Sequence, residues 1–213
     1  MAKILNWHSF RNRIKEKKLL IFTPYDVARI FGVSSVAANF FVFRNTKKGL
    51  LVRLKKSQKG SLYCLAEDVP DRFSIANRIY TPSYVSFDTA LSFHNIIPET
   101  VYSITSATTK STREFRIQGV LYIYHRIKRS AYTGYRPVNY ASSTILMASP
   151  EKALADYLYF VALKKRALNY ERLDLGKIAK LRLMKFVRIF DHAAMFDLVE
   201  QIYADFRRPA RIR

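Results

Sequence analysis

Cysteine, glycine and proline are all scarce in this chain of 213 residues. Cys64 is the single cysteine, so no disulfide can form within the chain, and a reducing compartment such as the cytoplasm is expected. Six glycines and seven prolines are too few for a linker or a low-complexity protein. The apolar run 157–163 falls far short of the roughly 20 residues that span a bilayer. The N-terminus also lacks the apolar core of a signal peptide, so we expect a cytoplasmic protein.

Acidic residues are scarce as well, and the charge imbalance is large. Lys and Arg number 37 against 16 Asp and Glu, which gives a net charge of +21. A folded protein this basic repels itself, so the composition favours a polyanionic partner, with nucleic acid ahead of an anionic membrane surface. A generally basic surface, as in thermophilic or ribosome-associated proteins, is the alternative. Residues 1–60 carry 14 basic residues and two acids, and so hold more than half of the excess.

Residues 4–46 have the pattern of three short helices. Apolar side chains recur on one face of 4–18, and Thr23 and Pro24 suit the cap and the first position of a helix that reaches residue 31. Gly32 can take the left-handed conformation that ends this helix, and Ser34 can cap the next one, over about 35–46. Two short helices across a Gly-Val-Ser turn are typical of a helix-turn-helix, although other helical hairpins use glycine turns too.

A β-hairpin is predicted directly after the third helix. Residues 50–55 alternate as a strand, 56–60 form a polar and basic turn, and 61–66 form the return strand. A hairpin with a basic tip at this place is a wing, so residues 1–66 are predicted to be a winged helix-turn-helix that binds DNA. The acidic, proline-containing segment 67–72 is the predicted linker to a second domain over 73–213.

The third helix would enter the major groove of duplex DNA. Packing needs Ala37, Ala38, Phe41 and Val42 inward, which leaves Phe40 and Phe43 outward, where packing on the second domain is the alternative to contact with DNA. Asn39 is the best candidate base reader because its amide can pair with adenine; a purely structural asparagine is an equal alternative. The cations are expected to bind phosphates. The predicted DNA contacts are Ser35, Val36, Asn39, Phe40, Arg44, Lys47, Lys48, Arg53, Lys55, Lys56, Gln58 and Lys59.

The second region is predicted to be a mixed α/β domain, which makes the whole chain α+β. Strands are expected over 83–86, 101–107, 113–117 and 120–127 in a small antiparallel sheet, and a short helix over 87–93 with Ser86 as its cap. Ser149, Pro150 and Glu151 open a helix with one apolar stripe. C-terminal helices are expected over about 175–190 and 193–206.

Signs of catalysis are few. The four histidines, His8, His94, His125 and His192, have no metal-ligand spacing, and the chain has no glycine-rich phosphate loop or nucleophile elbow. We therefore expect no enzyme, no metal and no cofactor. Two alternatives remain open: a nuclease site built from Asp88, Glu99, Glu114 and Glu151, and a stacking surface for a single strand built from the cations and tyrosines of 126–140. We favour caps and salt bridges for the acids, and a basic loop at the edge of a tyrosine-rich core for 126–140.

Three blocks of the sequence resemble the AbiEi family of antitoxins. They are residues 84–99 (YVSFDTALSFHNIIPE), residues 101–110 (VYSITSATTK) with Thr112 and Arg113 after them, and residues 148–158 (ASPEKALADYL). With the predicted winged helix they cover most of the chain. The middle block is the most specific part, since many regulators share a winged helix.

The resemblance implies a type IV toxin–antitoxin system that acts in abortive phage infection. Its antitoxin would repress its own operon by binding promoter repeats, and would counteract a neighbouring nucleotidyltransferase-like toxin without a stable complex. Repression would fall to Ser35, Asn39, Arg44 and the wing around Lys56 and Lys59, and the antitoxin role to the region after residue 72. The alternatives are a winged-helix regulator whose C-terminal domain dimerises or senses a ligand, and an enzyme that processes nucleic acid.

Overall fold

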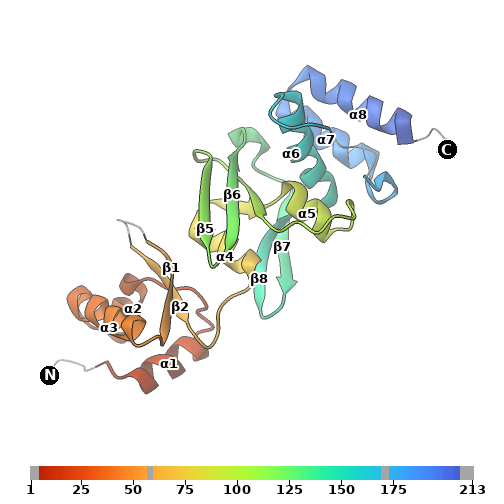
Figure 1. Ribbon diagram of the computed structural model, residues 1–213. Coiled ribbons are helices and arrows are strands. Elements are labelled where there is room, and N and C mark those ends of the chain that lie inside the picture. Colours follow the sequence, from red (N-terminus) through yellow and green to blue (C-terminus); the bar gives the residue numbers. More distant parts are fainter. Residues whose placement is uncertain (1–4, 57–59, 169–172, 207–213) are drawn as a thin grey trace. The chain divides into compact units, whose positions relative to one another are not determined.

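The computed structural model describes residues 5–56, 60–168 and 173–206 (Figure 1). The chain divides into two compact units, the first ending at Ile79 and the second beginning at Tyr80. Within the described residues the fold is α+β, with eight α-helices, one small antiparallel sheet and one larger mixed sheet. The α+β class expected from the sequence is therefore confirmed.

Capping residues close in sequence set the ends of three helices in the first unit. Helix α1 (Trp7–Glu16) is shorter than the predicted 4–18; α2 (Pro24–Phe31) and α3 (Ser35–Lys47) lie close to their predicted bounds. Thr23 caps α2 and exchanges hydrogen bonds with Asp26, while Gly32 ends this helix at a φ of 63°. Ser34 accepts a hydrogen bond from the Ala37 amide at the start of α3, as predicted.

A hairpin follows α3. Strands β1 (Leu51–Lys55) and β2 (Leu62–Leu65) pair antiparallel, and the predicted turn residues 57–59 lie outside the described residues. Phe10, Phe22 and Phe41 meet in a core to which the three helices and both strands contribute. Cys64 is buried on β2, as predicted, and burial raises the pKa of its thiol to about 11.

The expected boundary between the domains is wrong. Segment 67–72 was predicted to be a linker, but the first compact unit continues through it and through α4 (Arg72–Ile79). The Glu67 carboxylate forms ion pairs with two side chains of α1. Its Oε1 atom lies 2.6 Å from the Arg11 Nε atom and 2.7 Å from the Lys15 Nζ atom. The Lys55 ammonium donates to the carbonyl oxygen of Ile79 at 2.5 Å. These contacts tie segment 67–72 to α1 and tie α4 to β1, which the acidic, proline-containing composition of the segment does not reveal.

The sheet of the second unit is larger than expected and is not purely antiparallel. Its strands are β3 (Ser83–Val85), β4 (Ile104–Thr108), β5 (Arg113–Ile117), β6 (Val120–Arg126), β7 (Tyr135–Tyr140) and β8 (Ser143–Ala148). They lie in the order β5-β6-β4-β3-β8-β7, with β4 parallel to β6 and β3 parallel to β8. The last two strands were not predicted. Strand β7 contains Pro137, which is tolerated there because β7 is an edge strand.

Among the described residues, four α-helices and two short 3-10 helices complete the second unit. They are α5 (Phe87–Phe93), η1 (Arg129–Ala131), α6 (Pro150–Ala162), η3 (Leu175–Lys177), α7 (Lys180–Phe190) and α8 (Ala193–Phe206). Helix α5 contacts β4 and α6, and α7 and α8 pack on α6 (Figure 1). Every residue of α6 from Glu151 to Phe160 is buried, so the burial of this helix extends beyond the apolar stripe predicted for it. The predicted helix over 175–190 is interrupted after η3.

No single helix among the described residues is long and apolar enough to cross a membrane. Helices α2 and α3 reach that length and hydropathy only when taken together, and they bend by 119° at their junction.

Candidate nucleic-acid interface

Helix α3 has one face in the core and one face in solvent. Ala38, Phe41 and Val42 are buried as predicted, and Asn45 is buried beside them. Ala37 is exposed, so its predicted inward position is wrong: the inward positions of α3 follow a 38-41-42-45 spacing, which leaves residue 37 on the outer side.

The outward face of α3 carries an apolar stripe. Val36, Phe40 and Phe43 are 65%, 63% and 54% exposed, and their spacing of four and three residues places them in one row along the helix. We call these three residues the α3 stripe. Large exposed apolar side chains in a row are unusual on a helix surface and mark a surface that binds something.

Cations surround the α3 stripe at its C-terminal end. Arg44, Lys47 and Lys48 are exposed, and the Lys47 ammonium lies 4.7 Å from the centre of the Phe43 ring. Arg53 on β1 and Lys56 just after it are exposed too. No acidic residue occurs between Asp26 and Glu67 in the sequence, so nothing along this stretch offsets the positive charge. The arrangement is suited to binding phosphates around an apolar centre.

Asn39 and Lys55, two of the predicted DNA contacts, make side-chain hydrogen bonds within the first unit. Asn39 is exposed, but its amide nitrogen donates to the Ser35 carbonyl oxygen at 2.7 Å, which leaves one N–H and the amide oxygen for a base. Lys55 is half-buried and donates to Ile79 within the first unit, so its predicted role in phosphate binding is not supported. Gln58 and Lys59 lie outside the described residues.

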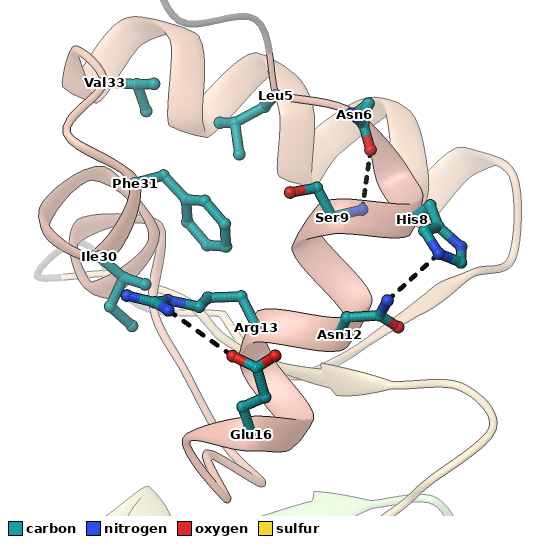
Figure 2. A pocket seen from close by; sticks show the side chains of 10 residues that line it. All are labelled: Leu5, Asn6, His8, Ser9, Asn12, Arg13, Glu16, Ile30, Phe31 and Val33. Carbon is teal, nitrogen blue, oxygen red and sulfur yellow. Dashed lines mark hydrogen bonds and ion pairs between the residues drawn. The ribbon is translucent and has the colours of Figure 1, made fainter.

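A separate pocket of about 640 Å³ lies between α1 and α2 in the first unit (Figure 2). Leu5, Ile30, Phe31 and Val33 supply its apolar side, and polar residues of α1 supply the other. Within this polar side, Arg13 pairs with Glu16 at 3.6 Å, and Asn12 lies 3.2 Å from His8. None of the predicted DNA contacts lines this pocket, so it is a feature distinct from the outward face of α3.

In the second unit, the Ser86 side chain does not cap α5 as predicted. It stands at the N-cap of α5 but makes no side-chain capping bond; its hydroxyl instead donates to the Asp156 carboxylate at 2.6 Å. The Tyr84 hydroxyl donates to the same carboxylate oxygen at 3.0 Å. Lys152 forms an ion pair with Asp156 from the preceding turn of α6. Sequence reasoning missed this buried cluster because its members are some 70 positions apart.

The acids considered for a nuclease site do not assemble one. Asp88 and Glu99 line a shared cavity of about 430 Å³, but Asp88 is paired with Arg166. Glu114 is exposed on β5, and Glu151 is buried in α6. Among the described residues, no group of three or more His, Cys, Asp or Glu side chains could hold a metal ion.

His125 lies beside the Asp88–Arg166 pair. Its Nε2 atom is 3.2 Å from the Arg166 guanidinium, and its ring packs against those of Phe87 and Phe160. Burial, with the charge of Arg166, lowers the pKa of His125 to about 4, so the ring is neutral at pH 7 and accepts a hydrogen bond from Arg166. This is a structural arrangement of three charged or polar groups, and its residues come from α5, β6 and the segment that follows α6.

The tyrosines of 126–140 largely face the interior. Tyr135 stacks on the buried Tyr84 at 4.6 Å, and Tyr132 packs against both rings. Two of the aromatic rings that could have stacked on bases are therefore used inside the second unit, whereas Arg126, Lys128 and Arg129 remain exposed. The interpretation as a basic loop at the edge of a tyrosine-rich core agrees with this geometry.

Comparison with known proteins adds no assignment: the sequence matches no protein-family model, and no curated protein matches it.

Proposed function

We propose that the protein is a DNA-binding transcriptional regulator and that α1–α3 with the β1–β2 hairpin act as a winged helix-turn-helix. The observation that carries the proposal is the outward face of α3. It presents an apolar stripe and the polar side chains of Ser35 and Asn39, with Arg44, Lys47 and Lys48 beside them. A helix of this kind fits the major groove of B-DNA, where base edges can be read.

The division of labour on this surface follows from chemistry. Arg44, Lys47, Lys48, Arg53 and Lys56 are assigned to phosphates, which fix position and give most of the affinity. Asn39, with one N–H free of the Ser35 carbonyl, is assigned to an adenine edge. Gln58 and Lys59 belong to the predicted basic tip of the wing and are assigned to the backbone as well.

The α3 stripe is assigned to thymine. The C5-methyl group of thymine is the one apolar group that a base edge offers in the major groove, and phenylalanine and other apolar side chains contact it. Val36 and Phe40 lie in the N-terminal half of α3, the part of a recognition helix that approaches bases most closely. An operator with thymines opposite this half of α3 therefore follows from the proposal.

For the second unit, we propose the antitoxin role that the AbiEi resemblance implies, with the toxin a nucleotidyltransferase-like enzyme encoded nearby. The support is the sequence of 84–99, 101–110 and 148–158, which contributes to β3, α5, β4 and α6. The first and third blocks are joined where Tyr84 and Ser86 donate hydrogen bonds to Asp156. No single residue of this unit is assigned to the antitoxin role.

DNA binding is tested by fluorescence anisotropy with two labelled duplexes, the region upstream of the gene and a scrambled copy. Titrations run at about 50 and 200 mM salt. Six to ten phosphate contacts should cost roughly a thousandfold or more in affinity over this range. The upstream duplex should bind more tightly than the scramble at both salt concentrations. Equal binding to both duplexes, lost together as salt rises, would show charge without sequence reading and would overturn the regulator proposal.

The antitoxin role is tested in cells with the full-length chain. A Lys47→Ala, Lys48→Ala double variant should lose repression of a reporter placed behind the upstream region, yet still protect cells that express the neighbouring toxin. The matched control is Lys17→Ala, Lys18→Ala, which removes the same charge from exposed positions at the end of α1. If the α3 variant folds but no longer protects, repression and protection are not separate functions of the two units.

A further inference from the structure

A second concentration of positive charge lies within the second unit. Where β6 ends and η1 begins, a pocket of about 640 Å³ is lined by four basic side chains, Arg126, Lys128, Arg129 and Lys165. The hydroxyl-bearing side chains of Thr109 and Thr112 also line it. No acidic side chain lines this pocket, so its charge is not balanced from within.

The four cations come from different parts of the chain and converge because of the fold. Arg126 is the last residue of β6, Lys128 and Arg129 belong to the turn into η1, and Lys165 follows α6. The Lys128 ammonium is held in place by donating to the Phe190 carbonyl oxygen at 2.6 Å. The Arg126 amide donates to the Thr112 hydroxyl at 3.1 Å, which fixes the wall beside it. The site is therefore partly ordered before any ligand enters.

The lowered pKa of His125, the residue before Arg126, supports a positive potential at this pocket. His125 precedes Arg126 on β6, and the charges of Arg166 and Lys165 add to burial in lowering its pKa, against the opposing effect of Asp88. Arg166 is already paired with Asp88, whereas Lys165 and Arg129 are exposed. The fold thus brings several cations to one concavity without an acid among them, which attracts an anion.

We propose that this pocket binds a polyphosphate group of the kind carried by a nucleoside triphosphate. A triphosphate carries several negative charges over a short length, which suits four cations around one concavity better than the extended backbone of a nucleic acid does. The volume lies in the range of small-molecule sites. The inference is independent of DNA binding by α3, and it would make the second unit responsive to a nucleotide.

The test is isothermal titration calorimetry of the full-length protein with ATP and, separately, with inorganic tripolyphosphate. The pocket variant is Arg126→Ala, Arg129→Ala. The matched control is Arg116→Ala, Arg182→Ala, which removes the same charge from exposed positions of the second unit that do not line the pocket. Thermal unfolding of both variants establishes that they are folded, and Lys165→Gln serves as a milder pocket variant if the double variant is not.

Both probes should bind the parent protein, and the pocket variant should bind each of them at least roughly tenfold more weakly, because charge-assisted hydrogen bonds are lost. The control variant should bind as the parent does. An equal loss of affinity in the control variant would show that the effect depends only on net charge, and would overturn the proposal. Failure of both probes, with a single-stranded oligonucleotide binding in their place, would overturn it in favour of a nucleic-acid track. None of these outcomes depends on whether α3 binds duplex DNA.

Discussion

Lys152 and Asp156 form an ion pair one helical turn apart on α6, with side chains that are 1% and 0% exposed. The Lys152 ammonium also lies 4.5 Å from the centre of the Phe190 ring, and the Asp156 carboxylate accepts hydrogen bonds from Tyr84 and Ser86. Burial raises the pKa of Asp156 and lowers that of Lys152, and the charge of each partner opposes the shift of the other. Two charges are thus kept inside the second unit by one another.

Removing one member of this pair should destabilise the protein strongly. Asp156→Asn leaves the Lys152 ammonium buried without its counterion, and we expect a loss of about 3–5 kcal/mol in the free energy of unfolding. The double variant Lys152→Met, Asp156→Asn removes both charges while leaving an acceptor for Tyr84 and Ser86, so it should lose less. Urea unfolding of the full chain measures both. A double variant as unstable as Asp156→Asn would show that the buried charge is not the cause.

His125 should make stability depend on pH. Its pKa is lowered from 6.5 to about 4 in the folded state, so the unfolded chain binds the proton more readily between these values. This contribution is complete above about pH 6.5 and is lost as the pH falls towards 4, and it amounts to at most roughly 3 kcal/mol.

The measurement is the unfolding free energy of the parent and of His125→Gln at several pH values from about 7 to 4. The difference between the two curves should shrink as the pH falls, since the variant has no imidazole to protonate. His94→Gln is a second test of the same effect, because burial, with the charge of Arg136, also lowers the pKa of His94. Parallel curves for parent and His125→Gln would contradict the prediction.

The α3 stripe should make DNA binding sensitive to thymine methyl groups. Replacing thymine by deoxyuracil in the upstream duplex keeps base pairing and removes only the methyl. Each methyl buried against Val36 or Phe40 is worth roughly 0.8 kcal/mol, or about fourfold in affinity. The parent should therefore prefer the thymine duplex, and Phe40→Ala should lose most of that preference.

Tyr102→Ala is the control, since Tyr102 is an exposed aromatic residue of the second unit. It should leave the preference for thymine unchanged. Tight binding of the parent to both duplexes with equal affinity would refute thymine reading while leaving DNA binding intact. Absence of binding to either duplex would instead refute the regulator proposal.

The length of the first unit can be tested with fragments. A fragment 1–79 contains α4 and retains the Lys55–Ile79 hydrogen bond and the Arg78–Asp26 ion pair at 3.8 Å, whereas a fragment 1–66 loses these and also Glu67. We expect 1–79 to unfold cooperatively at a higher temperature than 1–66, as followed by circular dichroism. Glu67→Gln in fragment 1–79 separates the contribution of the Arg11 and Lys15 contacts from that of α4. Equal midpoints of thermal unfolding for 1–66 and 1–79 would show that the first unit ends at residue 66.

The helices of the first unit could be predicted because their ends are decided locally. Thr23, Gly32 and Ser34 act on backbone groups within a few residues, so the sequence of each turn contains the information. The outward face of α3 could be predicted for the same reason, since helical spacing alone separates Phe40 from Phe41. Lys55 instead donates its hydrogen bond to the carbonyl oxygen of Ile79, a residue too distant in sequence for any local pattern to reveal.

The sheet of the second unit could be predicted only in part. Strands β5 and β6 follow one another as a hairpin and alternate clearly, whereas β8 pairs in parallel with β3, more than fifty residues earlier in the chain. An apolar stripe is predicted for helix α6, but residue type does not reveal that Glu151, Lys152 and Asp156 are buried as well, since charged residues are mostly exposed. In the structure Lys152 packs on the Phe190 ring of α7, Asp156 accepts hydrogen bonds from Tyr84 and Ser86, and the two charges pair with one another.

The pairing of Val85 with Met147 across β3 and β8 has a consequence for synthesis on the ribosome. The sheet of the second unit cannot be completed until the last of these residues has left the ribosome, whereas the first unit needs only the chain up to Ile79. Domains generally fold as they emerge, and pairings between distant segments form slowly. A nascent chain therefore passes through a stage in which the proposed DNA-binding unit is folded and the proposed antitoxin unit is not. Translation that stops early would leave a repressor that cannot protect the cell.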